Sequence, residues 1–113
     1  MNRLTIDFET YYDSEFTLSK LTVPEYIFNP RFEVIGVSVA CNNTHPKWFT
    51  GTKKETKQWL QQFDWKNSLC VAHNAQFDGA ILEWFFDIHP KMYLCTMMGS
   101  RPIIYPWRGR MSL

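Results

Sequence analysis

The stretch from Ser68 to Ile88, SLCVAHNAQFDGAILEWFFDI, carries the pattern that decides the fold. It opens with a short apolar run, residues 68–72, which is typical of a buried strand. Apolar residues then recur at helical spacing, which predicts an amphipathic helix with one wide apolar face: Phe77, Ala80, Ile81, Trp84, Phe85 and Ile88. His89-Pro90 ends this pattern. A buried strand that passes directly into a helix predicts an α/β domain.

The segments around this unit extend the sheet. Residues 3–8 alternate between apolar and polar, and residues 32–40 form the most strand-like run. Asn42-Asn43 is a turn signal, and residues 46–50, with Trp48 expected in the core, read as the second arm of a hairpin. Residues 92–95 predict one more strand. We therefore expect three antiparallel strands followed by βαβ connections, which gives a mixed sheet with helices packed on it.

Two short helices are predicted from their starts. Thr22-Val23-Pro24-Glu25 places proline in a first helical turn. Thr52 and Glu55 have the Thr-x-x-Glu spacing of a capping box.

Composition sets broad limits on the protein. A chain of 113 residues with 45% apolar residues is sufficient for a single domain over residues 1–113. The formal net charge of +1 neither supports nor excludes a nucleic-acid partner. Three cysteines without a CxxC pair disfavour structural zinc and suit a reducing compartment. Because we find no signal peptide and no run of about 18 apolar residues, we expect a cytoplasmic protein without a membrane partner.

Asp7 and Glu9 are the first candidate site residues. Residues two apart on a strand project from the same face, so this pair places two carboxylates close together. Like charges at that spacing repel, and a divalent cation such as Mg²⁺ or Mn²⁺ would neutralise them. The alternative is two acids in water at a sheet edge.

The second candidate is His73-Asn74-Ala75-Gln76-Phe77-Asp78, where the buried strand passes into the helix. Ligands bind at such carboxyl ends of strands in open α/β sheets. Asp78 falls in the first helical turn and off the apolar face. Two structural alternatives remain open, since Asn74 suits an N-cap and Asp78 is favoured there by the helix dipole.

Together, Asp7-Phe8-Glu9 after a first strand and Asn74-x-x-x-Asp78 at a strand-to-helix junction resemble the DnaQ-like, or DEDD, exonuclease superfamily. The longer sequence segments around these motifs, residues 7–10, 29–37 and 72–78, look like the proofreading domain of phage-type family-A DNA polymerases. The resemblance runs over essentially the whole chain. It implies an RNase H-like fold whose sheet has three antiparallel strands extended by two parallel ones.

The resemblance also implies a 3′–5′ exonuclease that hydrolyses the terminal phosphodiester of single-stranded DNA with two divalent cations, Mg²⁺ or Mn²⁺. Asp7 would bridge both metals, Glu9 would bind the water-activating metal, and Asp78 would serve the second. The substrate-binding residues it implies are Phe8, Thr10, Asn74 and Phe77. It places such a protein in the host cytoplasm if a phage encodes it.

This sequence departs from the family in its third motif, which pairs a fourth acid with a preceding His or Tyr. After Asp87 the chain contains no Asp or Glu, so His89, Tyr93 and Tyr105 lack a downstream acid. The position before Thr96, often acidic in the family, is Cys95. We therefore expect an exonuclease domain that is incomplete at its carboxyl end, with the remainder of a DNA polymerase as a partner.

Two other functions stay open. One is a catalytically inactive module that binds nucleic acid or a partner chain. The other is an RNase H-like endonuclease, against which the Asn74 to Asp78 motif argues.

Overall fold

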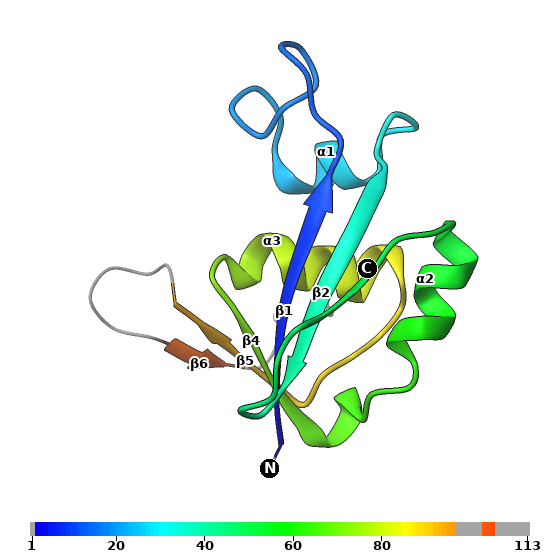
Figure 1. Cartoon of the computed structure of the whole chain (residues 1–113). Coiled ribbons are helices and arrows are strands. Elements are labelled where there is room, and N and C mark those ends of the chain that lie inside the picture. Colours follow the sequence, from blue (N-terminus) through cyan, green and yellow to red (C-terminus); the bar gives the residue numbers. More distant parts are fainter. Residues whose placement is uncertain (1, 97–102, 106–113) are drawn as a thin grey trace.

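The computed structural model describes residues 2–96 and the backbone of residues 103–105, and these form one mixed sheet against which helices pack (Figure 1). The six strands lie in the order β3-β2-β1-β4-β5-β6. Their bounds are β1 (Asn2–Thr10), β2 (Val34–Cys41), β3 (Lys47–Phe49), β4 (Ser68–Ala72), β5 (Met92–Cys95) and β6 (Ile103–Tyr105).

The pairing follows the sequence prediction for the first five strands. β3, β2 and β1 are antiparallel neighbours, and β4 and β5 continue the sheet in parallel with β1. The predicted α/β class and the three-plus-two arrangement are therefore confirmed. β6 adds an antiparallel strand beside β5, which no pattern in the sequence predicted.

The helices begin where capping chemistry predicts. α1 (Val23–Ile27) and α2 (Lys53–Leu60) each start after a threonine that forms a complete capping box with the glutamate three residues later. A 3₁₀ turn, η1 (Trp65–Asn67), leads into β4. α3 (Ala75–Ala80) follows β4 and continues as a π-helical segment, η2 (Ile81–Phe85).

The prediction of one regular α-helix reaching Ile88 is wrong in its second half. The backbone N–H of Phe86 donates to the carbonyl of Ile81, a π-type bond over five residues, at 3.1 Å. Asp87 then adopts a positive φ of 55° and turns the chain toward β5. The wider π turn changes which side chains face the sheet, because its angular step per residue differs from that of an α-helix.

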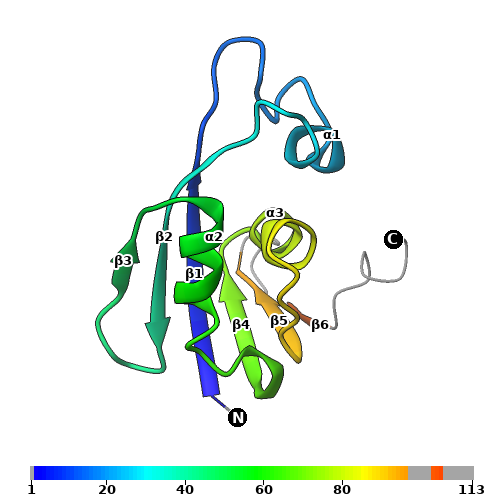
Figure 2. The ribbon, with the colours of Figure 1, turned by 90° about the vertical axis from the view of Figure 1, so that its right-hand side faces the viewer.

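The two faces of the sheet differ in character. Along β1, Leu4, Ile6 and Phe8 are buried, whereas Thr5, Asp7 and the other alternate residues are exposed. Figure 2 shows α2 and α3 on the same side of the sheet, and Phe8 stacks on Phe86 from the helical side at a ring separation of 5.8 Å. The main core lies between the sheet and the helices, and β1 presents its carboxylates on the opposite face.

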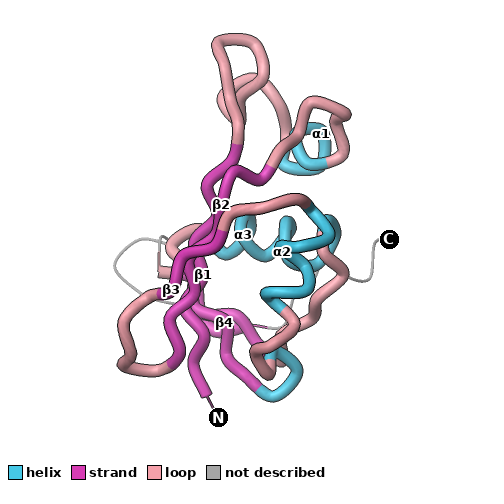
Figure 3. The backbone as a smooth tube through the Cα atoms, turned by 45° about the vertical axis from the view of Figure 1, so that its right-hand side comes forward, coloured by secondary structure: helices cyan, strands magenta, loops and turns pink. Residues whose placement is uncertain are grey.

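The segment between β1 and β2 extends beyond the end of the sheet and carries α1 (Figure 3). An aromatic cluster fixes it: the Tyr26 ring lies 4.5 Å from that of Phe16 and 5.4 Å from that of Phe32. The Tyr26 hydroxyl lies 3.0 Å from Oγ1 of Thr10, so the base of this segment stands beside the last residue of β1. Within the described part of the chain, no helix has the combined length and apolar character needed to cross a membrane.

Candidate functional site

The acid pair lies near the carboxyl end of β1, on the face away from the helices. Asp7 and Glu9 are both exposed, as their alternation with buried Ile6 and Phe8 requires. In the antiparallel register with β2, Asp7 is opposite Ser38 and Glu9 is opposite Gly36. The predicted placement of two carboxylates on one strand face is confirmed.

Asp78 reaches the same strand from α3. The parallel pairing of β1 with β4 ends at Thr5 and Val71, so the backbone farther along β1 is open to another partner. The backbone N–H of Phe8, which sits between the two acids, donates to Oδ1 of Asp78 at 3.1 Å. Residues 70 positions apart are thereby brought together at the junction of β1 and α3.

The environment of Asp78 favours its neutral form. The side chain is buried, with 4% of its surface exposed. Burial, with a smaller contribution from the negative charges of Asp7 and Glu9, raises the pKa of Asp78 to about 7, although the hydrogen bond from the Phe8 N–H acts in the opposite direction. The three carboxylates therefore interact electrostatically. Such a group gains from a cation that removes the repulsion and replaces the proton.

Asn74 caps the helix that carries Asp78. Its Oδ1 accepts a hydrogen bond from the Phe77 backbone N–H at 3.4 Å, so the N-cap alternative is confirmed. The adjacent His73 is exposed, and its Nδ1 lies 3.4 Å from Oγ1 of Thr96 at the end of β5. Buried Cys95 receives the Ala75 N–H on its sulfur at 3.5 Å and holds this corner together.

The predicted substrate-binding residues on β1 and α3 differ in how far their side chains are exposed and in what they contact. The ring of Phe8 is 5% exposed and packs in the core, so only its backbone faces the acids. Thr10 has its Oγ1 3.0 Å from the hydroxyl of Tyr26. Phe77 is half-buried with its ring 6.0 Å from that of Tyr26. Contact with a nucleotide stays a prediction for all three.

Tyr93 and His89, which were considered for the third motif, both form hydrogen bonds with Glu83. The Tyr93 hydroxyl donates to Oε2 of Glu83 at 2.8 Å, and Nδ1 of His89 bonds the other oxygen of Glu83. Nε2 of His89 lies 2.7 Å from Oδ1 of Asp87. Tyr105 lies outside the residues whose side chains are described.

Glu83 was not predicted as a site residue. Regular helical spacing puts it off the apolar face, but the structure buries it at 2% exposure in the π-helical segment. Both nitrogens of His89 face carboxylates, and a neutral imidazole carries only one N–H, so the arrangement favours imidazolium. Burial opposes that charge, but the hydrogen bonds and charges of Glu83 and Asp87 raise the pKa of His89 overall.

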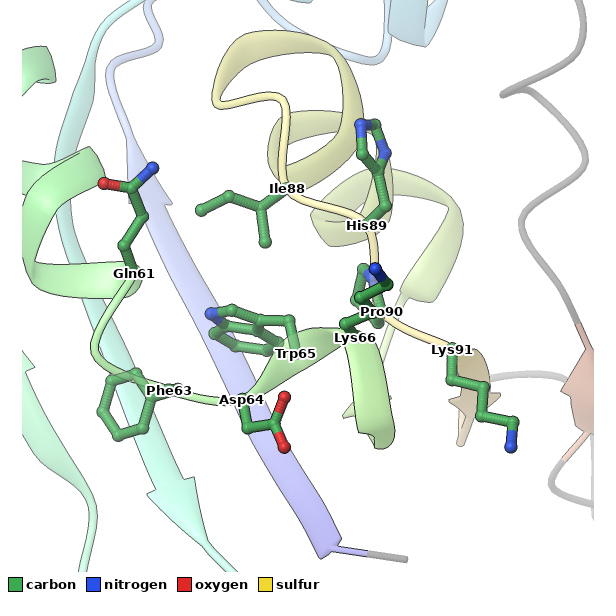
Figure 4. A pocket seen from close by; sticks show the side chains of 9 residues that line it. All are labelled: Gln61, Phe63, Asp64, Trp65, Lys66, Ile88, His89, Pro90 and Lys91. Carbon is green, nitrogen blue, oxygen red and sulfur yellow. The ribbon is translucent and has the colours of Figure 1, made fainter.

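A pocket of about 660 Å³ opens at the other end of the sheet, before the first residues of β4 and β5 (Figure 4). Its lining includes Trp65, Ile88 and Pro90, with Lys66 and Lys91 among its polar residues. The acids lie instead toward the carboxyl end of β1 and at the start of α3. This pocket is therefore separate from the candidate site.

Carboxylates are suitable ligands for Mg²⁺ or Mn²⁺, and Asp7, Glu9 and Asp78 are the residues that could hold such ions here. Among residues 2–96, however, the side chains do not form a group of three or more His, Cys, Asp or Glu close enough to hold a metal ion. The three acids have the ligand type and the negative charge that a metal site needs. Their side chains would have to move closer together to coordinate an ion fully.

No protein-family model matches the chain, and no curated protein resembles it significantly.

Proposed function

We propose that this chain is a 3′–5′ exonuclease (proofreading) domain of a phage-type DNA polymerase, with an RNase H-like, DnaQ-like fold. The observation that carries the proposal is the hydrogen bond from the Phe8 N–H to Asp78. It places the acid of the second motif at the peptide between the two acids of the first. The β3-β2-β1-β4-β5 order supports the proposed fold.

The proposed substrate is the 3′ end of single-stranded DNA, and the reaction is hydrolysis of its terminal phosphodiester. Two divalent cations, Mg²⁺ or Mn²⁺, would supply an activated water and neutralise charge on the leaving 3′ oxygen. Asp7 and Glu9 would hold them from the open face of β1, where DNA has access. Asp78 would complete the set from a fixed position, because the Phe8 N–H orients its carboxylate.

Each further residue has a defined part in this proposal. Asn74 fixes the first turn of α3 and hence the position of Asp78. Phe8 supplies its backbone N–H, which orients Asp78, while its ring anchors β1 in the core. Thr10 and Phe77 stand beside the acids at the base of the α1 segment and would line the place of the terminal nucleotide.

The test is Mn²⁺-dependent degradation of 5′-labelled single-stranded DNA by the full chain. An exonuclease yields a ladder that shortens from the 3′ end, and Asp7→Ala should abolish it. Cuts at internal positions would favour the endonuclease alternative instead. Replacing the 3′-terminal phosphodiester with a phosphorothioate linkage should slow an exonuclease strongly but leave an endonuclease active at internal positions.

The second candidate function is a non-catalytic exonuclease-like module that binds nucleic acid or a partner chain. It is favoured by the absence of a ready three-ligand group among the described residues 2–96. DNA binding without any metal-dependent cleavage, and with Asp7→Ala binding like wild type, would support this candidate over the first.

A further inference from the structure

Trp48 stands in one row with the acid pair. Asp7 is opposite Ser38 on β2, and Ser38 is opposite Trp48 on β3. Residues directly opposite one another in a sheet project from the same face, so the indole shares the open face with the carboxylates. Neighbouring strands are separated by about 5 Å, which puts the backbone of Trp48 roughly 10 Å from that of Asp7.

Gly36 brings the indole closer still to the acids. A Cβ atom at Gly36 would lie 2.1 Å from Cζ2 and 2.4 Å from Cη2 of Trp48, so the ring occupies space that any other residue would fill. Gly36 is itself opposite Glu9. The six-membered ring of Trp48 is therefore one strand away from Glu9, and the glycine permits this position.

The indole is exposed although the sequence pattern placed it in the core. Trp48 has 54% of its surface exposed, which corrects that prediction. The alternation along β3 turns it to the face that α2 and α3 do not cover. The indole is a large flat ring held over Gly36, beside the carboxylates of the proposed cleavage site. Such a ring is a suitable surface on which an unpaired base can stack.

We propose that Trp48 is a stacking platform for a base near the 3′ end of the single-stranded substrate, and that Gly36 is a positioning residue for its ring. This inference rests on the proposed exonuclease function and adds a substrate contact to it. The base would stack on the indole while the adjoining phosphate reaches the face of Asp7 and Glu9. Stacking tolerates any base, which suits a reaction without sequence preference.

The first experiment measures binding of the full chain to 5′-fluorescein single-stranded DNA by anisotropy in Ca²⁺, with a gel confirming intact DNA. Trp48→Ala should weaken binding roughly 5- to 150-fold, the range that corresponds to loss of one stacked base. Trp48→Phe should retain part of the affinity. Phe28→Ala is the matched control, because Phe28 is also an exposed aromatic but stacks on Trp84 of η2.

An abasic scan locates the stacked base and separates stacking from a structural effect. Oligonucleotides carry an abasic site at each of the three 3′-terminal positions in turn. At the stacked position, wild type should lose affinity, and Trp48→Ala should show no further loss, because the same contact is already missing. Additive losses at all positions would overturn the platform even if Trp48→Ala binds weakly.

Gly36→Ala tests the positioning role without changing the ring. The added methyl displaces the indole and should reduce affinity in the same direction as Trp48→Ala, with a raised KM and little change in kcat. Wild-type affinity in Gly36→Ala would overturn the positioning role. If wild type cleaves DNA and Trp48→Ala binds equally well, the platform fails while the exonuclease proposal stands; if wild type neither binds nor cleaves, both fail.

Discussion

The backbone N–H of Phe8 donates a hydrogen bond of 3.1 Å to the carboxylate of Asp78, which joins the first strand to the start of α3. The flanking residues of Phe8 are the exposed acids Asp7 and Glu9. One peptide group therefore orients a buried carboxylate beside two exposed ones.

Asp78→Asn should stabilise the metal-free protein at pH 8. The pKa of Asp78 is about 7 in the folded chain against 3.8 as the ordinary value, so ionisation disfavours folding and stability falls as pH rises between these values. Asparagine retains an oxygen for the Phe8 N–H but carries no charge. We expect a gain of roughly 2–4 kcal/mol at pH 8 and little gain at pH 4, measured by urea unfolding.

Binding of Mn²⁺ should strengthen as pH rises from 5 to 8. A cation at this site competes with the proton that Asp78 carries below its pKa of about 7. The rise in melting temperature on adding Mn²⁺ should therefore grow with pH, and chelation should reverse it. An Mn²⁺-induced shift that is equal at pH 5 and pH 8 would show that Asp78 is not a ligand.

His89→Gln should remove a second contribution to the pH dependence of folding stability. The pKa of His89 is raised in the folded chain, so its stabilisation is complete below the ordinary value of 6.5 and is lost as pH rises through the folded value. Wild type should lose stability over this interval, and the variant should lose less. Comparing both proteins in an Asp78→Asn background isolates the imidazole, and parallel curves would contradict the assignment.

Replacing Phe8 with another large apolar residue should preserve folding and cleavage, whereas truncating its side chain should destabilise the fold. Phe8→Leu keeps both the backbone N–H and an apolar side chain, so cleavage should persist. Phe8→Ala leaves a cavity beside Phe86 and should cost about 3–5 kcal/mol of unfolding free energy. Folded Phe8→Leu without activity would mean that the aromatic ring itself contacts the substrate.

Much of the fold could be predicted from local patterns. The capping boxes at Thr22 and Thr52, the turn at Asn42-Asn43 and the apolar run of β4 each depend on neighbouring residues alone. The alternation in β1 likewise gave the correct face to Asp7. These features are readable because turn, cap and strand chemistry acts over a few residues.

The missed features depend on contacts distant in sequence. The π-helical segment that buries Glu83 follows from packing and from its bonds with His89 and Tyr93, which helical periodicity does not contain. Trp48 was expected in the core because it is a large apolar residue in a strand. The sequence of that short strand does not show which of its two faces the helices cover. The bond between Phe8 and Asp78 spans 70 residues and needs the parallel register of β1 and β4.

The measurement that tests the central claim most directly is Mn²⁺-dependent shortening of 5′-labelled single-stranded DNA by the wild-type chain, Asp7→Ala and Thr5→Ala. Thr5 lies exposed on the same strand face and serves as the matched control. We predict a ladder from the 3′ end with wild type and Thr5→Ala, lost with Asp7→Ala or on chelation. Equal products from wild type and Asp7→Ala, or no metal-dependent product from any of the three, would contradict an exonuclease site in this chain.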